Sequence, residues 1–499
     1  IGPSAFASTK GLGKVTINAN IDTLETNTFG SSGITAVIMP QSLRTIKTGA
    51  FTSCASLADI ELNDGLKTIE ASAFEKATGK DAVVNLVIPE SVTVIGDKAF
   101  SSTAGLGEVT INANITRLNS NVFEKSGIQK VHFPDTLISV GSNAFLSCTN
   151  LTEIEFPESV TTLENTAFQK SGLITLELPD TIKTIGEGTF SNCASLKTVT
   201  TSSNMETIAP SAFANCKVLT DVVIKQGTKT IDSDAFSGCK ALVNLTLPEG
   251  LEKINDSAFA NTAALTEINF PSTLDTIGDG AFSGNGVVTL TLPTNLTTLG
   301  KNAFKGCKTL ETVTVSASVT SFGDSAFASC AALKNVNLET GLTVIGSSAF
   351  TGCKVLEKVS IPSTITDVNS KAFYGCSSLT SATFNGTAPT NFGDKVFDST
   401  SKSGFVIYAP ENKGYTTPKW NTYDCIIRAI TSINIILPTK TEYQEGEDFD
   451  PTGMSVSITY DNGETRDLVD GEYSLSGYDS NPGIKVITVE YLDKSATLL

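Results

Sequence analysis

Histidine is almost absent from this sequence, which has one, His132, among 499 residues. A zinc site of the HExxH type needs two histidines and is therefore excluded, and only His132 could serve a Ser–His–Asp relay. His132 lies in KVHFP between Val131 and Phe133, where strand alternation points its ring toward solvent. No GxxxxGK[ST] or GxGxxG motif opens a helix after a strand. We therefore expect no enzymatic activity and no cofactor.

Positive charge is also scarce, with 35 Lys and Arg against 52 Asp and Glu, which gives a net charge of −17. This excess of negative charge repels nucleic-acid phosphates and anionic membrane surfaces, so we expect no nucleic-acid partner. The sequence contains no run of about 18 apolar residues, so we expect no membrane insertion in this segment. The opening IGPSAFAST reads as the interior of a repeat, so it does not indicate the cellular compartment of the protein.

What the sequence does contain is a repeat marked by phenylalanine. Eighteen phenylalanines recur at an average spacing of 23 residues, and a three-residue insertion in EKATGKDAVV explains the one long step. A unit of this length cannot bury its apolar face alone, so neighbouring units should stack as a solenoid. The positions are Phe6, Phe29, Phe51, Phe74, Phe100, Phe123, Phe145, Phe168, Phe190, Phe213, Phe236, Phe259, Phe282, Phe304, Phe327, Phe350, Phe373 and Phe397.

One unit, LTEINFPSTLDTIGDGAFSGN, occupies residues 265–285. Leu265, Ile268 and Phe270 read as inward positions of a short strand. Pro271 then ends the strand, because proline cannot donate to a β-ladder. Phe282 is expected to fill the far side from a short 3₁₀ or helical turn. The same pattern predicts strands at NLTLP (244–248), EIEFP (153–157) and KVSIP (358–362).

The pattern of these units, L-x-x-I-x-[LF]-P-x-x-[LV]-x-x-I-x-x-x-A-F-x-x-C, resembles the leucine-rich repeats of the bacterial BspA-like family over residues 1–428. The resemblance implies a leucine-rich-repeat solenoid with a parallel β-sheet on one face and short 3₁₀ or helical turns on the other. Members of that family are linked to attachment to host proteins or other cells. It therefore also implies an extracellular or cell-surface protein, secreted or attached to the cell wall.

Nine of the ten cysteines stand three residues after a repeat phenylalanine, and every other occupant of that slot is small. Free cysteine behaves as a small, easily buried hydrophobe. The nearest cysteines are 23 residues apart, unlike the close pairs of zinc sites. Stacked cysteines would satisfy the Cα distance of a disulfide, but their parallel Cβ vectors oppose it. We favour buried thiols over disulfides and over metal ligands, and read Cys425, which is out of register, as a core residue.

The repeat array is predicted to span residues 1–403, and GFVIYAPENKGYTTPKWNTYDCIIRAI (404–430) follows it as a C-terminal cap. The cap begins with a strand at 405–408 and supplies Tyr415, Trp420 and Tyr423. Aromatic side chains of this kind can seal the end of a solenoid against water and against other chains.

Residues 431–499 have a different pattern. MSVSITYDNGETRDL alternates apolar and polar residues and turns at Asn462-Gly463, which predicts a hairpin, and IKVITVEYLDKSATLL supplies a second strand pair. The segment resembles a bacterial immunoglobulin-like domain of the third type. That resemblance implies a small all-β sandwich, used on surface proteins as a spacer or a wall-proximal stalk.

Alternation along the predicted strands defines a candidate partner-binding face. It consists of Lys130, His132, Glu153, Glu155, Thr175, Glu177, Asn244, Thr246, Glu267, Asn269, Asn335 and Asn337, with Thr198, Thr200, Thr312 and Thr314 on the same side. Paired carboxylates such as Glu153 and Glu155 can serve a glycosidase, but on an open strand face we read them as solvated. Binding hot spots favour Trp, Tyr and Arg, and these positions have none. Either the face binds weakly and multivalently, or the aromatic C-terminal end makes the contact.

These observations favour a non-enzymatic cell-surface or secreted bacterial protein that binds or adheres through an extended repeat surface. The expected partners are host or bacterial surface proteins or glycans, and we expect a monomer. The alternative is a structural spacer or assembly module within a larger surface protein.

Overall fold

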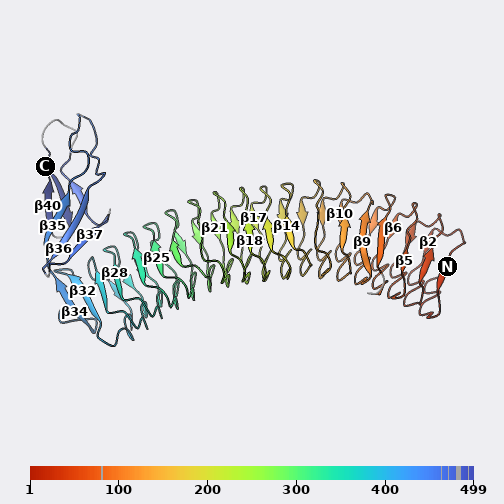
Figure 1. Cartoon of the computed structure of the whole chain (residues 1–499), viewed down its shortest axis with the longest axis horizontal. Helices are drawn as coiled ribbons and strands as arrows, with labels where there is room; N and C mark the ends of the chain where they lie inside the picture. Colours follow the sequence, from red (N-terminus) through yellow and green to blue (C-terminus); the bar gives the residue numbers. More distant parts are fainter. Residues whose placement is uncertain are drawn as a thin grey trace. The chain divides into compact units, whose positions relative to one another are not determined.

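In the computed structural model, the described residues are 1–79, 83–444, 446–461, 463–469, 471–478, 485–492 and 494–498. Residues 80–82 of the predicted insertion lie outside them. The chain divides into two compact units, Ile1–Val287 (unit 1) and Val288–Leu499 (unit 2). Within each unit, consecutive coils stack with their strands side by side (Figure 1). Short β-strands joined by turns make up the described residues, and no helix forms among them.

The longer strands of unit 1 form what we call the long-strand row, in which each strand pairs in parallel with its equivalent in a neighbouring coil. Val199 of β16, for example, lies opposite Val222 of β18, and each is 1% exposed. The row consists of β1 (Lys14–Thr16), β3 (Ala36–Ile38), β5 (Asp59–Ile60), β7 (Val84–Ile88), β9 (Leu106–Ile111), β11 (Lys130–His132), β14 (Thr175–Glu177), β16 (Thr198–Thr200), β18 (Asp221–Val223) and β20 (Asn244–Thr246).

A second row of two-residue strands, the short-strand row, runs along unit 1. An outward Thr followed by an inward Ile or Leu is its commonest pattern, as in Thr230 and Ile231. The row consists of β2 (Thr23–Leu24), β4 (Thr45–Ile46), β6 (Thr68–Ile69), β8 (Val94–Ile95), β10 (Arg117–Leu118), β12 (Ser139–Val140), β13 (Thr162–Leu163), β15 (Thr184–Ile185), β17 (Thr207–Ile208), β19 (Thr230–Ile231), β21 (Lys253–Ile254) and β22 (Thr276–Ile277). The two rows enclose the dry interior of each coil.

Two strands predicted from the sequence are wrong, because no strand forms at 153–157 or at 265–270. In both coils a phenylalanine holds the last inward position: Phe156 packs edge-on against Phe168 at 5.7 Å, and Phe270 against Phe282 at 5.5 Å. The inward residue two places earlier is only half-buried in each case. A phenylalanine at this position does not by itself prevent a strand, because Phe133 directly follows β11, which pairs with β9.

The repeat phenylalanines form a continuous stack of rings inside unit 1. Adjacent centroids from Phe6 to Phe282 are 4.9–5.6 Å apart, and their planes differ by 4–20°. From Phe29 to Phe282 each ring is fully buried. Their backbone also joins the coils, as where the Phe236 N–H donates to the Ala258 carbonyl at 2.7 Å. The predicted solenoid core is confirmed.

The segments around these phenylalanines are hydrogen-bonded turns, so the predicted 3₁₀ or helical turns are not confirmed. Two residues in every repeat, one two places before the phenylalanine and one two places after it, have a positive φ. Around Phe259 these are Ser257 at 55° and Asn261 at 60°. A left-handed residue on each side of the phenylalanine interrupts the right-handed dihedrals that a 3₁₀ helix requires.

Unit 2 begins with coils of the same kind. Its long-strand row consists of β23 (Thr289–Thr291), β25 (Thr312–Val315), β26 (Asn335–Leu338), β28 (Lys358–Ile361), β30 (Ser381–Phe384), β32 (Val406–Pro410) and β34 (Tyr423–Arg428). Its short-strand row consists of β24 (Thr298–Leu299), β27 (Val344–Ile345), β29 (Asp367–Val368) and β31 (Asn391–Phe392). Rings from Phe304 to Phe397 stack at 5.1–5.7 Å. The 404–430 segment therefore extends the row by two parallel strands.

The aromatic residues of that segment pack inward. Trp420, on β33 (Lys419–Trp420), is 8% exposed and lies 4.6 Å from Phe392 and 5.8 Å from Phe384. Tyr415 is also 8% exposed and lies 4.9 Å from Trp420. These rings cover the apolar residues of the last coils, and Cys425 lies buried beneath them at 2% exposure.

The remainder of unit 2 is an antiparallel β-domain. One sheet contains β35 (Ile430–Ile436), β36 (Ser455–Tyr460) and β37 (Thr465–Leu468), and the other contains β38 (Ser474–Ser476), β39 (Ile487–Tyr491) and β40 (Lys494–Leu498). The predicted hairpin is the β36–β37 pair, although Asn462 of its turn lies outside the described residues. The second predicted pair is β39–β40. Val456, Ile458, Val489 and Tyr491 form the centre of the core.

Candidate functional site

The outward side chains of the long-strand row form a surface that we call the strand face. In unit 1, Lys130 and His132 of β11 point outward on either side of Val131, which is 4% exposed. Thr175 and Glu177 of β14 are exposed in the same way, opposite Thr198 and Thr200 of β16. The alternation expected from the sequence therefore positions these side chains correctly.

Charged residues gather on one part of this face. His132 Nε2 lies 2.6 Å from Glu108 Oε1 on β9, and Lys130 Nζ lies 3.2 Å from Glu153 Oε1 on the next coil. The hydrogen bond with Glu153 raises the pKa of Lys130. Glu155 is exposed on the same coil as Glu153. Glu108, Glu153 and Glu155 all act on the charge of Lys130, and Glu177 lies on the following coil, so this part of the face is negative. Exposed ion pairs of this kind contribute little to stability, so they leave the face adaptable.

The remaining predicted residues of unit 1 lie further along the array. On β20, Asn244 Nδ2 donates to Asp221 Oδ1 at 2.6 Å, and Thr246 is exposed. That bond and one from the Thr220 hydroxyl lower the pKa of Asp221, with Thr220 having the larger effect. Glu267 and Asn269 are exposed on the coil without a strand. The predicted residues thus form a polar band along successive coils, with no single cluster.

In unit 2 the strand face is mostly uncharged. Asn335 and Asn337 on β26 donate from their amides to the hydroxyls of Thr312 and Thr314 on β25, both at 3.3 Å. An open depression of about 490 Å³ lies beside the two asparagines. Its rim is charged, because Lys334, Glu357 and Lys358 also line it.

The strand face has an aromatic residue that the sequence-based list left out. Tyr408 on β32 is half-buried and lies opposite Thr383 of β30 and Ile426 of β34, which is 48% exposed. The alternation in FVIYAP predicts this outward position, which lies beyond Asn337, the last residue of the predicted face. The end of the face therefore differs in composition from the rest.

The glycosidase alternative gains no support from the shape of the face. An open depression of about 560 Å³ is lined by His132, Glu90 and Asp135 among others, but Glu153 and Glu155 do not line it. Small-molecule sites are normally concave and bury most of their ligand. The arrangement suits contact with a large, extended partner.

Clusters of metal-binding side chains and helices able to span a membrane are both absent from the described ranges. No group of three or more His, Cys, Asp or Glu in them is placed to hold a metal ion. The same ranges contain no helix with the length and hydropathy of a membrane span.

The ten cysteines are buried, reduced thiols, as predicted. In the repeats they also make a hydrogen bond that the sequence did not reveal. The Cys239 thiol donates to the Phe213 carbonyl at 3.2 Å, and the Cys148 thiol to the Phe123 carbonyl at 2.9 Å. Burial raises the pKa of both thiols to about 12. They are therefore protonated at neutral pH and unsuited to nucleophilic chemistry.

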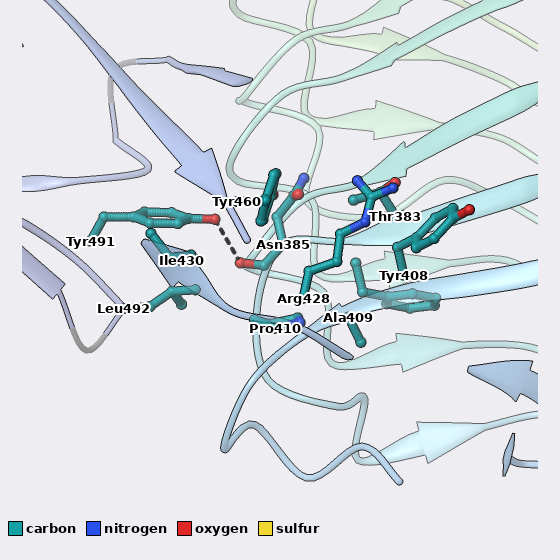
Figure 2. A pocket seen from close by; sticks show the side chains of 11 residues that line it. Thr383, Asn385, Tyr408, Ala409, Pro410, Arg428, Ile430, Tyr460, Tyr491 and Leu492 are labelled. Carbon is teal, nitrogen blue, oxygen red and sulfur yellow. Dashed lines mark hydrogen bonds between the residues drawn. The ribbon is translucent and has the colours of Figure 1, made fainter. Parts of the chain in front are cut away.

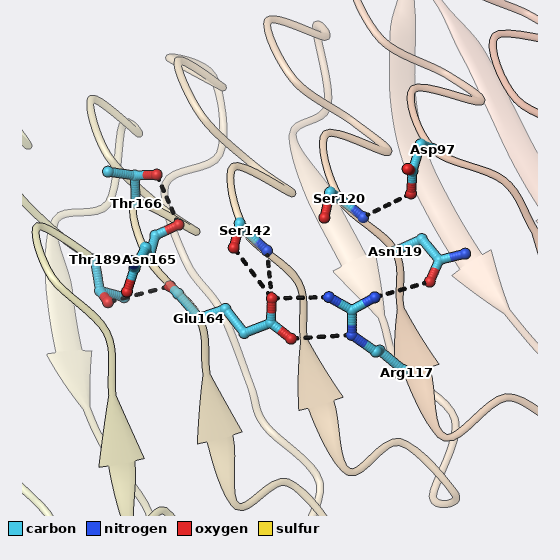
Figure 3. A network of polar contacts seen from close by, with 9 residues as sticks. All are labelled: Asp97, Arg117, Asn119, Ser120, Ser142, Glu164, Asn165, Thr166 and Thr189. Carbon is cyan, nitrogen blue, oxygen red and sulfur yellow. Dashed lines mark hydrogen bonds and ion pairs between the residues drawn. The ribbon is translucent and has the colours of Figure 1, made fainter.

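A polar network along one corner of unit 1 supports the array (Figure 3). Arg117 donates from Nε and Nη2 to the two carboxylate oxygens of Glu164, at 2.9 and 2.8 Å, across two coils. Glu164 also accepts from the Ser142 N–H and hydroxyl at 3.1 Å. Burial opposes ionisation, but these bonds lower the pKa of Glu164. Similarly, the Ser120 N–H donates to Asp97 at 3.2 Å. Side chains of one coil thus satisfy backbone groups of the next.

Models of two known protein families match this chain. The model of the BspA type leucine rich repeat region matches residues 1–84, 78–177, 161–288 and 277–404. The chain belongs to the BspA-type leucine-rich repeat family. The model of the bacterial Ig-like domain (group 3) matches residues 436–498. Both resemblances noted in the sequence are confirmed. A search of curated proteins finds no significant match.

Several solved structures resemble this BspA-type chain. A leucine-rich repeat protein from Bacteroides ovatus ATCC 8483 is 25% identical with a TM-score of 0.54, and the match covers 73% of this chain and 82% of that chain. One from Eubacterium ventriosum ATCC 27560 is 25% identical with a TM-score of 0.37, covering 55% and 83%. A leucine rich cell surface protein from Faecalibacterium prausnitzii A2-165 is 23% identical with a TM-score of 0.34, covering 66% and 83%.

The Bacteroides ovatus structure supports the same fold for the BspA-type array. Leucine-rich repeat and immunoglobulin-like families are generally binding or structural modules, and leucine-rich repeat proteins generally bind proteins. The strand face is therefore the natural place to look for function.

Proposed function

We propose that this chain is a non-enzymatic bacterial protein, secreted or attached to the cell surface, that binds partners through its strand face. The partners are host or bacterial surface proteins or glycans, and the protein acts as a monomer. Family membership supports the binding role and the surface location. The candidate residues are those of the predicted partner-binding face, from Lys130 to Asn337.

The observation that carries this proposal is the repeated exposure of polar side chains along neighbouring coils. Neighbouring strands of a sheet are about 4.8 Å apart, so the face offers donors and acceptors at regular intervals. Lys130 is 43% exposed, His132 44% and Glu153 63%. Individually such contacts are weak, but a partner that contacts many coils at once gains affinity from their number.

Binding to extracellular-matrix proteins and to a glycan array would test the proposal. One variant combines Glu153→Gln, Glu155→Gln and Glu177→Gln on the charged part of the strand face. If the partner is bound there, its affinity should fall by roughly tenfold or more, which corresponds to about 1.4 kcal/mol. The loss should shrink as salt is added, because salt screens exposed charges.

The matched control removes the same charge elsewhere on unit 1. Glu187, Glu206 and Glu252 are exposed and lie outside the long-strand row, so Glu187→Gln, Glu206→Gln and Glu252→Gln should leave the affinity unchanged. Thermal unfolding should be the same for both variants. An equal loss of affinity in both would mean that net charge, rather than the strand face, governs binding.

The spacer alternative rests on one observation, the absence of Trp, Tyr and Arg from the predicted positions of the face. As a spacer, the chain would bind none of the probes. Display of a partner domain on a bacterial surface would then depend on the number of coils and be insensitive to the Glu→Gln variants.

A further inference from the structure

The passage from the last solenoid strand to the immunoglobulin-like domain contains no linker. β34 ends at Arg428 and β35 begins at Ile430, so Ala429 alone separates them. The Asp461 N–H donates to the Ala429 carbonyl at 2.9 Å, and Ile430 is 6% exposed within the core of the domain. Free movement between domains needs a flexible segment, and a single residue between two paired strands does not supply it.

Arg428 joins the two parts through its side chain, which is 14% exposed. Its guanidinium carbon lies 3.7 Å from the ring centre of Tyr408 in the solenoid and 5.4 Å from that of Tyr460 in the immunoglobulin-like domain. Its Nη1 also lies 2.7 Å from Glu464 Oε2. A planar guanidinium can stack on an aromatic ring and pair with a carboxylate at the same time, and lysine cannot reproduce both.

A second contact involves Tyr491, which is 2% exposed. Its hydroxyl donates to the Asn385 carbonyl of the solenoid at 3.0 Å (Figure 2). The same hydroxyl accepts from Arg466 Nη2 at 3.0 Å. Arg466 is in turn held by Glu472 at 3.0 Å, so the tyrosine is oriented from its own domain. Asn385 itself is 3% exposed.

The contact is closely packed and reaches a second coil. The cavity lined by Asn385, Arg428 and Tyr491 has a volume of about 10 Å³, the space of a single water molecule. Gly471 of the immunoglobulin-like domain lies against a different coil: a β-carbon at this position would be 3.1 Å from Thr340 Oγ1. Two contact points on different coils oppose rotation about either one.

We propose that the immunoglobulin-like domain is fixed on the end of the solenoid in a single orientation and that Arg428 and Tyr491 hold it there. The strand face of the last coils then keeps a fixed direction relative to the immunoglobulin-like domain. The alternative is a module that turns freely, which is the usual behaviour of neighbouring domains with small, polar interfaces.

Spin labels on introduced cysteines would test the proposal in the full chain. Lys358→Cys on β28 and Thr497→Cys on β40 place exposed labels on the two sides, while the native thiols stay buried. We expect one narrow distance distribution between the labels. Arg428→Ala should broaden it, and Tyr491→Phe, which keeps the ring but removes the bond to Asn385, should broaden it as well.

The control is Lys419→Ala, which breaks the exposed 2.8 Å ion pair with Asp424 in the same segment and should leave the distribution narrow. If Arg428→Ala unfolds the domain, Arg428→Lys replaces it in the distance measurement. It keeps the charge beside Glu464 but loses the stacking, so it should broaden the distribution. A distribution that is already broad in the parent protein, or one that stays narrow in the Arg428 and Tyr491 variants, would overturn the proposal.

Discussion

For single residues, the position three residues after each repeat phenylalanine has one property that the sequence predicts, its burial, and one that it does not, a hydrogen bond. Its small occupants predicted burial correctly. Its hydrogen bond was not predicted, because the acceptor is the carbonyl of a phenylalanine one coil earlier. Such a bond is made by Cys54, Cys148, Cys193, Cys216, Cys239, Cys330, Cys353 and Cys376. Seventeen of the eighteen occupants carry a side-chain donor, and Ala77 is the exception. The position therefore favours a donor as well as a small volume.

Substitution of Cys239 by Thr and by Val separates the two requirements. Both side chains are β-branched and similar in volume, but only Thr can donate to the Phe213 carbonyl. We expect the Thr variant to be more stable than the Val variant by about 0.5–1.5 kcal/mol, the usual contribution of one hydrogen bond. Chemical denaturation measures the difference. A Val variant as stable as the Thr variant would show that size alone matters.

At the element scale, the turns around the phenylalanines explain why a helical prediction failed. The apolar spacing of Ala and Phe is compatible with a helical turn, and periodicity alone does not distinguish it from the observed turns. The residues that distinguish the two kinds of turn lie two places before and two places after the phenylalanine. Ser, Asn, Asp, Lys and Gly dominate there, and Gly, Asn and Asp tolerate a positive φ better than other residues. A β-branched residue at these positions is rare, with Thr166 as one instance.

Asn261 offers a direct test of this turn. It is exposed and has a φ of 60°, and the equivalent positions in the adjacent coils are Gly238 and Gly284. Asn261→Gly should be nearly neutral, because glycine adopts this conformation without a steric penalty. Asn261→Val should lower the free energy of unfolding by about 1–2 kcal/mol. Equal stability of the two variants in urea would contradict the role given to the left-handed residue.

In the strands, the local sequence pattern fixes which side chains point outward, but it does not fix whether the strand hydrogen bonds form. Inward and outward positions follow from alternation alone, so Glu153 and Glu267 are exposed as expected. Alternation does not fix the ladder hydrogen bonds, because the coils of Phe156 and Phe270 keep the inward and outward pattern although no strand forms there. The outward residues of the candidate face could therefore be predicted one by one, whereas the two coils in which no strand forms could not.

At the scale of the whole molecule, the repeat period and the change of pattern after the array predicted the architecture, because each coil repeats the same local solution. The contact between the solenoid and the immunoglobulin-like domain was not predictable in this way. Tyr491 and Asn385 are 106 residues apart, and Tyr491 lies outside the repeats, so no repeating pattern reveals the contact. Composition indicated only that the tyrosines gather near the C-terminus.

Local coupling between coils leads to a last prediction. Phe236 is fully buried between Phe213 and Phe259, with both ring centres at 5.2 Å, so Phe236→Ala should cost about 3–5 kcal/mol. Because the packing and backbone contacts of a coil are made mainly with the coils next to it, this loss should separate the unfolding of the coils around Phe236 from that of distant ones.

The only tryptophan makes this separation visible. Trp420 reports on the end of unit 2, whereas far-ultraviolet circular dichroism reports on the strands of the whole chain. In Phe236→Ala the dichroism should begin to fall at a lower denaturant concentration than the fluorescence changes. Thr246→Ala, an exposed change on β20, should leave the relation between the two curves as in the parent protein. Two curves that shift together in Phe236→Ala would mean that unfolding is cooperative across many coils and that the nearest-neighbour description is wrong.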